Sequence, residues 1–244
     1  MVRDFTFNEV YYLLLAARWT VLLALIAFGG GGLLGFVIAA LRVSPSRVLN
    51  WVAQGYIQFF QGTPLLIQLF MVFYGTAFIG ISPDPWTAAA VTFILNSAAF
   101  FGEIFYGSIQ SVPAGQWEAS RSLGFRFLAT LRLVILPQAF RLMVPPTIGF
   151  MVQIVKGTSV ASLIGLTELA RTATVINTVT FEPALVFGTV ALIYFALCWP
   201  LSLLGAAMER RLRVDVRRTP LDAVAPDAIT QAVAGVEGRL VDGK

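Results

Sequence analysis

Residues 115–137 read GQWEASRSLGFRFLATLRLVILP, a polar stretch that stands between long apolar runs. Gly115 can cap a helix in which Glu118 takes the third position, where an acid interacts favourably with the helix dipole. Gly124 can end the same helix in a left-handed conformation. The sequence therefore predicts a short helix of about two turns, with its own start and stop signals, inside a loop.

The composition is that of a membrane protein. Of the 244 residues, 57% are hydrophobic and only 12% are charged, and the mean hydropathy is +0.79. The chain has no histidine and a single cysteine, Cys198, which excludes histidine-based triads, HExxH zinc sites, disulfide frameworks and iron–sulfur clusters. Neither Lys156 nor Lys244 stands in a Gly-Lys-Ser/Thr sequence, so this chain cannot bind ATP through a Walker A loop, and any ATP energy must come from another subunit.

The apolar runs predict five membrane spans. The first, residues 19–41, carries no charge and is long enough to cross the hydrocarbon core. An amphipathic stretch at 5–17 precedes it and is expected to lie at the membrane interface. The later spans are expected at about 56–79, at 86–109, from Pro145-Pro146 to Leu166, and at 183–208, with a partly helical external connection around residues 168–182.

The arginines indicate the orientation. They gather at 42–47, 121–141 and 210–218, and such clusters mark cytoplasmic loops rather than a nucleic-acid surface. Five spans then place the N-terminus outside and the C-terminus in the cytoplasm. The expected organisation is an N-terminal interfacial segment (1–18), a membrane domain (19–213) with a cytoplasmic loop (111–141), and a cytoplasmic tail (214–244) whose composition predicts disorder.

The loop resembles a known motif. Glu118-Ala119-Ser120, three residues, Gly124, nine residues and Val134-Ile135-Leu136-Pro137 resemble the EAA loop of ABC importer permeases, with Ser120 and Val134 as mild departures. Three further segments resemble the histidine/glutamine type, the permeases for polar amino acids, over about residues 10–213. They are IQSVPAGQWEA at 109–119, GTPLLIQLF at 62–70 and KGTSV at 156–160.

This resemblance implies an all-α, polytopic helical bundle of five transmembrane helices with the type I ABC importer permease fold, in the bacterial inner (cytoplasmic) membrane. It implies a transport subunit that is not an enzyme and needs no cofactor in this chain, because ATP and Mg are bound by partner ATPase subunits. The expected partners are two ATP-binding subunits, a second permease subunit in a homo- or heterodimer, an external solute-binding protein, the amino-acid substrate and membrane lipid, and no nucleic acid.

The helix within 113–125 is expected to couple ATPase motion to alternating access, because a short rigid helix can transmit movement when its contacts differ between two states. For Glu118, a role in the fold of the loop and a direct ATPase contact both remain open. The coupling residues are predicted to be Gly115, Gln116, Trp117, Glu118, Ala119, Ser120, Arg121, Gly124 and Pro137.

Polar residues inside apolar runs predict the substrate pathway. Glu103 is the foremost, since an acid at mid-membrane costs about 2.5–3.5 kcal/mol, although an internal ion pair is the alternative. Gln153 and Lys156 lie three apart on one helix face, and a snorkelling position is the alternative for Lys156. Gly157, Thr158 and Ser159 can interrupt the helix and expose backbone groups to substrate.

Three positions depart from many relatives. Gln61 and Tyr106 stand where these have arginine, and Gly157 where they have aspartate. A strongly cationic amino acid is therefore less expected than another polar amino acid or a derivative such as an opine. Three other functions remain as alternatives. An ion-coupled secondary transporter of a small polar solute would need ion-coupling groups, and Glu103 is nearly the only candidate. A membrane enzyme would need a catalytic cluster, which the sequence does not show, and a structural partner without transport is the third alternative.

Overall fold

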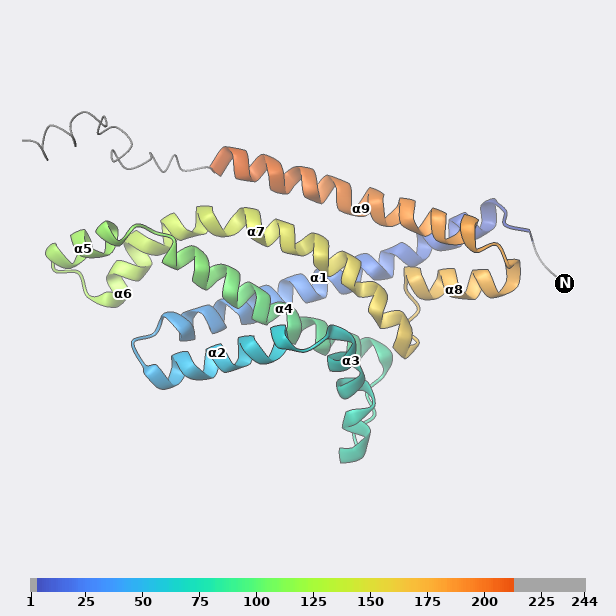
Figure 1. The fold of residues 1–244 in the computed structure, drawn as a ribbon, viewed down its shortest axis with the longest axis horizontal. Helices are drawn as coiled ribbons and strands as arrows, with labels where there is room; N and C mark the ends of the chain where they lie inside the picture. Colours follow the sequence, from blue (N-terminus) through green and yellow to red (C-terminus); the bar gives the residue numbers. More distant parts are fainter. Residues whose placement is uncertain (1–3, 213–244) are drawn as a thin grey trace, which may run out of the picture. The chain divides into compact units, whose positions relative to one another are not determined.

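The structure is a computed structural model that describes residues 4–212, and within this range it contains helices and no strand. Short 3-10 helices, Gly75–Ile79 and Thr158–Ile164, follow the third and seventh α-helices, and a π-helical turn, Leu131–Ile135, precedes the seventh. The predicted tail lies outside the described residues. The α-helices are α1 (Phe7–Val43), α2 (Arg47–Gly62), α3 (Leu65–Phe73), α4 (Pro85–Gln110), α5 (Ala114–Ser122), α6 (Phe127–Thr130), α7 (Leu136–Gly157), α8 (Leu169–Thr180) and α9 (Pro183–Leu212) (Figure 1).

Four stretches are each long and apolar enough to cross a membrane: Phe7–Val43, Pro85–Gln110, Phe127–Ile164 and Pro183–Leu212. The helix pair Arg47–Gly62 and Leu65–Ile79 passes the same test together but is bent by 100°. Five spans result when this pair is one broken span. The predicted all-α bundle is confirmed, and the predicted partly helical connection before the last span contains α8.

The contact between α1 and α4 brings two backbones unusually close. A Cβ atom added at Gly31 would lie 2.5 Å from the Cβ of Ser97, and one added at Gly35 would lie 2.5 Å from the Cβ of Phe101. Real Cβ atoms do not approach so closely, so glycine is required at both positions. Small residues four apart are the usual means of close helix packing in membranes.

The second span is not one helix, and the prediction of a single span from 56 to 79 was wrong in this respect. α2 ends at Gly62, and α3 leaves in a different direction after Pro64 (Figure 1). The cause is Pro64, which has no N–H and holds Thr63 in an extended conformation, φ −114° and ψ 140°. The Gln68 side-chain amide donates to the carbonyl oxygens of Phe60 (2.8 Å) and Thr63 (3.0 Å), which stabilises the break.

The fourth span begins earlier than predicted. Pro145 and Pro146 were expected at its start, yet both lie inside α7, and Pro137 occupies the first turn instead. The apolar stretch extends back to Phe127. The helix continues through the proline pair because residues before and after the pair are packed. Met143 is buried with the end of α4, and Ile154 is buried in the main core.

The first helix also begins earlier than predicted. α1 is continuous from Phe7 to Val43, so residues 7–17 are not a separate helix. Leu13 and Ala17 are buried against α8 and α9, in a cluster with Leu169 and Val186. The sequence misses this contact because its partners lie about 150 residues away. The interfacial position of this segment, and the division into domains, stay predictions.

We expect Gly35→Val to disrupt the α1–α4 contact. Its side chain must displace Phe101 or the backbone beside it, and overpacking of this kind costs about 1–3 kcal/mol. The thermal unfolding temperature of the detergent-purified chain should fall by several degrees. Gly29→Val is the matched control, because nothing lies within 4 Å of a Cβ atom at Gly29 on the same helix. Equal losses in both variants would contradict the close contact.

Candidate functional site

The loop between α4 and α7 forms the predicted short helix, α5. Its N-cap is Pro113 and not Gly115, which lies inside the first turn. The prediction for the other end is confirmed, since Gly124 has φ +81° and follows the last turn. The amide groups of Gly124 and Phe125 donate to carbonyl oxygens of Arg121 (2.9 Å) and Ser120 (3.0 Å), a helix ending that favours glycine in the left-handed position.

Glu118 does not lie in the first turn of α5. The helix begins one residue before Gly115, so Glu118 is its fifth residue, and the predicted interaction with the helix N-terminus was wrong. Its side chain is exposed, and the carboxylate has no hydrogen bond or ion pair to any residue in 4–212. The alternative of direct contact with a partner is therefore the one that the geometry favours.

One face of α5 is anchored to the membrane helices. Trp117 stacks on Phe127 with ring centroids 6.2 Å apart, and it packs against a buried cluster that contains Ile109 and Ile135. Ser120 is also buried on this face. Contacts with the end of α4 and with the segment before α7 hold α5 in place.

A side-chain amide also links α5 to the start of α7. The Gln138 amide donates to the Gln116 side-chain oxygen (3.3 Å) and to the Val134 carbonyl oxygen (2.7 Å). Val134 belongs to the π-helical turn just before Pro137, which has no N–H to donate. Gln138 therefore connects α5 to the irregular start of α7.

The opposite face of the loop is open. Leu123 and Leu128 are 76% and 71% exposed, although both are large apolar side chains. The same loop carries Glu118 and Arg121, which are exposed and charged. Exposed apolar groups rimmed by polar residues are typical of protein contact surfaces. The predicted coupling residues that are exposed are Gly115, Gln116, Glu118, Ala119, Arg121, Gly124 and Pro137, whereas Trp117 and Ser120 face inward.

Two helix interruptions meet at the other end of α7. At Thr158 the chain changes from α-helix to 3-10 helix, as the predicted interruption requires. A Cβ atom added at Gly157 would lie 3.6 Å from both Leu65 of α3 and Phe93 of α4. The end of α7 therefore lies against the break between α2 and α3. In a membrane, irregular backbone of this kind is tolerated where it is buried in protein or lines a cavity.

Polar side chains accompany these interruptions. Gln68 is buried and accepts a hydrogen bond from the side-chain amide of Asn96 (3.0 Å), so Asn96 makes the interhelical bond that its position in an apolar helix suggests. Gln153 and Lys156 are exposed one turn apart on α7, as predicted. The hydroxyl groups of Thr158 and Ser159 donate to backbone carbonyl oxygens of Val155 (2.7 Å) and Lys156 (2.9 Å).

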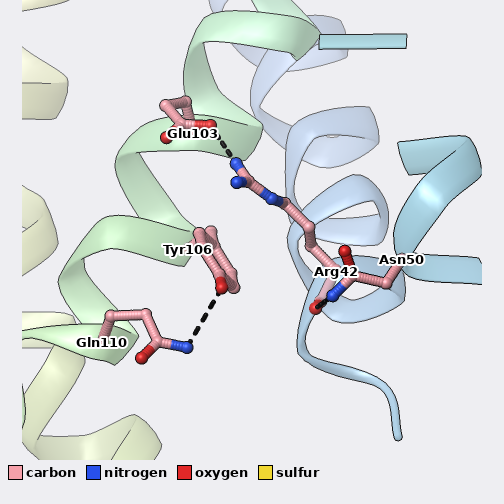
Figure 2. A network of polar contacts seen from close by, with 5 residues as sticks. All are labelled: Arg42, Asn50, Glu103, Tyr106 and Gln110. Atoms are coloured by element: carbon pink, nitrogen blue, oxygen red, sulfur yellow. Dashed lines mark hydrogen bonds and ion pairs between the residues drawn. The ribbon is translucent and has the colours of Figure 1, made fainter. Parts of the chain in front are cut away.

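Glu103 lies elsewhere. Its carboxylate forms an ion pair with Arg42 of α1, and the Arg42 guanidinium carbon lies 4.0 Å from the centroid of the Tyr106 ring (Figure 2). The Asn50 amide donates to the Arg42 carbonyl oxygen (2.7 Å), which adds α2 to the cluster. The internal ion pair, left open from the sequence, is what the structure contains.

The structure therefore does not bring the predicted pathway residues together. Ten residues of α4 separate Phe93, beside Gly157, from Glu103, which is about 15 Å along a helix. Gln153, Lys156, Gly157, Thr158 and Ser159 form one region, and Glu103 belongs to a cluster nearer the other end of α4. Substrate contact by Glu103 stays a prediction.

Sequence reasoning missed a buried acid. Glu168 is fully buried and caps α8, where it accepts from the Arg171 amide (2.9 Å). The hydroxyl groups of Thr20 (3.2 Å) and Tyr194 (3.4 Å) also donate to it. Glu168 lies between two spans, and burial raises the pKa of its carboxyl above the ordinary value. Its N-cap position was visible in the sequence, but its partners on α1 and α9 were not.

The comparisons with known proteins agree with this geometry. Residues 31–214 match the family described as binding-protein-dependent transport system inner membrane component. The L-cystine transport system permease protein TcyB of Bacillus subtilis is 40% identical over 195 residues, 80% of this chain and 83% of that protein. The glutamine transport system permease protein GlnP of Escherichia coli is 32% identical over 200 residues, 81% of this chain and 91% of that protein. A chain in a crystal structure of an amino acid ABC transporter with histidines is similar with a TM-score of 0.80 and 33% identity, over 86% of this chain and 100% of that chain.

We expect the Arg42–Glu103 pair to hold α1 to α4. Glu103→Gln leaves the Arg42 side chain, which is 14% exposed, without its anionic partner, while position 103 itself is half-exposed. The loss of stability should be about 1 kcal/mol, and Arg42→Gln in the same chain should restore part of it. Thermal unfolding in detergent measures both, with the exposed Glu209→Gln as control. A double variant no more stable than Glu103→Gln would contradict the pairing.

We expect Glu168 to make stability depend on pH. Because its pKa is raised on folding, the folded chain binds this proton more tightly than the unfolded chain does. This stabilisation is complete below the ordinary glutamate pKa and is lost as the pH rises through the raised pKa. The unfolding temperature of the natural chain should therefore fall relative to Glu168→Gln as the pH rises from about 4 to 7. Glu182→Gln, at the nearby start of α9, is the control, and a difference independent of pH would refute the expectation.

Proposed function

Because the chain belongs to the family of binding-protein-dependent transport system inner membrane components, we propose that it is the permease subunit of an ATP-driven importer for a polar amino acid or an amino-acid derivative. It is a multi-pass membrane component and a transport subunit rather than an enzyme. Its proposed partners are a second permease subunit, two ATP-binding subunits on the cytoplasmic side, and an external solute-binding protein.

The observation that carries the proposal is the two-sided environment of α5. Its inner face is fixed by Trp117 and Ser120, while Glu118, Arg121 and Leu123 are exposed on the outside. A helix that only filled space in the bundle would not present this surface. We assign the exposed face to the ATPase subunits, where Glu118 pairs with a basic side chain and Leu123 enters an apolar recess.

α7 connects this surface to the proposed substrate region. It begins beside the Gln138–Gln116 hydrogen bond and ends at Gly157, and its 22 residues span about 33 Å. A tilt of α5, driven by ATP hydrolysis in the partner subunits, acts on the first turn of α7 through Gln138. The other end of α7 then moves against α3 and α4, which changes access to the site between them.

The proposed substrate region lies where α3, α4 and the end of α7 meet. Lys156 is the one exposed cation among its predicted residues, and its ammonium group suits the carboxylate of an amino acid. Gln153 offers both a donor and an acceptor one turn away. The relatives named for L-cystine and glutamine transport support a zwitterionic, polar substrate. A positive site also disfavours a strongly cationic amino acid.

We expect the purified complex to hydrolyse ATP faster when its substrate is supplied. The chain would be co-purified with its ATPase and second permease subunit, placed in liposomes, and tested with the solute-binding protein and a panel of cystine, glutamine, arginine and an opine. Stimulation and uptake with one of the neutral compounds supports the proposal. If no ATPase is bound and the chain alone moves solute down an ion gradient, the secondary-transporter alternative replaces it.

The same assay tests the coupling helix through Gly124→Ala. A left-handed residue with a Cβ atom costs about 1–2 kcal/mol, so the end of α5 should shift and substrate-stimulated hydrolysis should fall severalfold while the subunits remain assembled. Gly107→Ala on α4 is the control, because that glycine is exposed with open space around its Cβ position. Unchanged stimulation of ATP hydrolysis in the Gly124 variant would show that α5 does not couple ATP hydrolysis to transport.

A further inference from the structure

A groove of about 560 Å³ runs between α1 and α9 and is separate from both regions described above. Leu14 and Val21 of α1 line it, as do Leu192 and Leu197 of α9. Two polar side chains also reach it, Arg18 and Thr189. The groove is therefore lined mainly by apolar side chains and carries one cationic group.

Arg18 has no anionic partner among the described residues. Its side chain is exposed, and its guanidinium carbon lies 4.9 Å from the ring centroid of the neighbouring Trp19. It directly precedes an uncharged run of more than twenty residues, 19–41. An arginine at the end of a membrane span is stabilised when its side chain reaches an anion or the interface.

The height of Arg18 in the bundle follows from its aromatic neighbours. Trp19 lies edge-on to Trp86, with ring centroids 5.3 Å apart, and Trp86 is the second residue of α4. The exposed Asp84 caps that helix end. Tryptophan is enriched where the bilayer meets water, so Arg18 lies at the level of the lipid headgroups at this end of the bundle.

The apolar part of the groove extends from this level into the hydrocarbon region. Leu197 packs with the main core, which also contains Leu23 and Ala24, about one to two turns deeper along α1 than Arg18. From Thr189 to Leu197 the groove follows α9 for about 12 Å. Arg18 lies within this stretch, about one turn from both Leu14 and Val21 along α1, so the groove continues on both sides of the cation. An apolar groove that passes a cation at this level matches a phospholipid, with its phosphate on the guanidinium and an acyl chain along the deeper part of the groove.

We propose that this groove binds one anionic phospholipid, with an acyl chain between α1 and α9 and the headgroup phosphate paired with Arg18. The guanidinium forms paired hydrogen bonds with two phosphate oxygens, and Thr189 lines the same groove. The lipid neutralises the charge that the chain itself leaves unpaired and fills the space between the two helices. The proposal rests on the membrane location of the chain and not on its substrate or its ATPase partners.

The test uses the full chain in detergent, stripped of lipid and titrated with phosphatidylglycerol while native mass spectrometry counts bound lipids. One phosphatidylglycerol should bind more tightly than phosphatidylcholine, whose headgroup carries its own cation. Arg18→Gln should weaken the first binding step about tenfold or more, as expected for loss of a charged hydrogen bond. Arg171→Gln, which removes another exposed arginine on α8, is the control and should change nothing.

A second variant keeps the charge and fills the channel. Ala196→Trp places a large side chain in the groove and should abolish tight phosphatidylglycerol binding with Arg18 still present. Unchanged binding in both variants overturns the proposal, as does an equal loss in Arg171→Gln. If millimolar inorganic phosphate displaces phosphatidylglycerol, the site recognises the phosphate without the acyl chain, and the proposal of a lipid site is wrong. If Arg18→Gln instead reduces subunit association while lipid binding stays constant, the groove is occupied by protein and the proposal is wrong.

Discussion

The approach of α1 to α4 at Gly31 and Gly35 is the contact on which the other helices depend. In a bilayer the lipid is as apolar as the side chains, so helices associate through close packing and polar contacts rather than by escape from water. Removing two side chains lets the backbones meet over several turns. α2, α3 and α7 then pack against α4, and α8 packs against α1. A bulkier residue at either glycine would therefore disturb more than one pair of helices.

A second constraint shapes the irregular parts of the bundle, because the backbone groups of a broken helix must find partners inside the protein. Gln68 meets this constraint at Pro64 by donating to two carbonyl oxygens and by accepting from Asn96 on α4. The second interruption, at Thr158, uses side-chain hydroxyl groups in the same way. Both interruptions lie at the same place, the region that we propose for the substrate.

The two ends of α7 have different surroundings, and this difference suits a subunit that converts movement into access. One end is a proline-containing turn tied to α5 by Gln138, and the other meets the broken span. The Arg42–Glu103 cluster, with Tyr106 and Asn50, holds α1, α2 and α4 together apart from this path. In the proposed mechanism, α7 moves beside this cluster, which keeps α1, α2 and α4 together.

The amino-acid sequence by itself determined the membrane location, the helical class and the left-handed end of α5 at Gly124. Each depends on composition or on residues near one another in the chain, and the family resemblance drew on the same local motifs. Only the tertiary structure decided that Glu103 pairs with Arg42, and that Gln68 donates to backbone carbonyl oxygens at the break before Pro64. The same holds for the burial of Glu168 between Thr20 and Tyr194. The reason is that the partner of a polar group in a membrane depends on which helices touch and at what height. The linear pattern of apolar residues is compatible with many rotations and shifts of those helices, so it does not identify the partner.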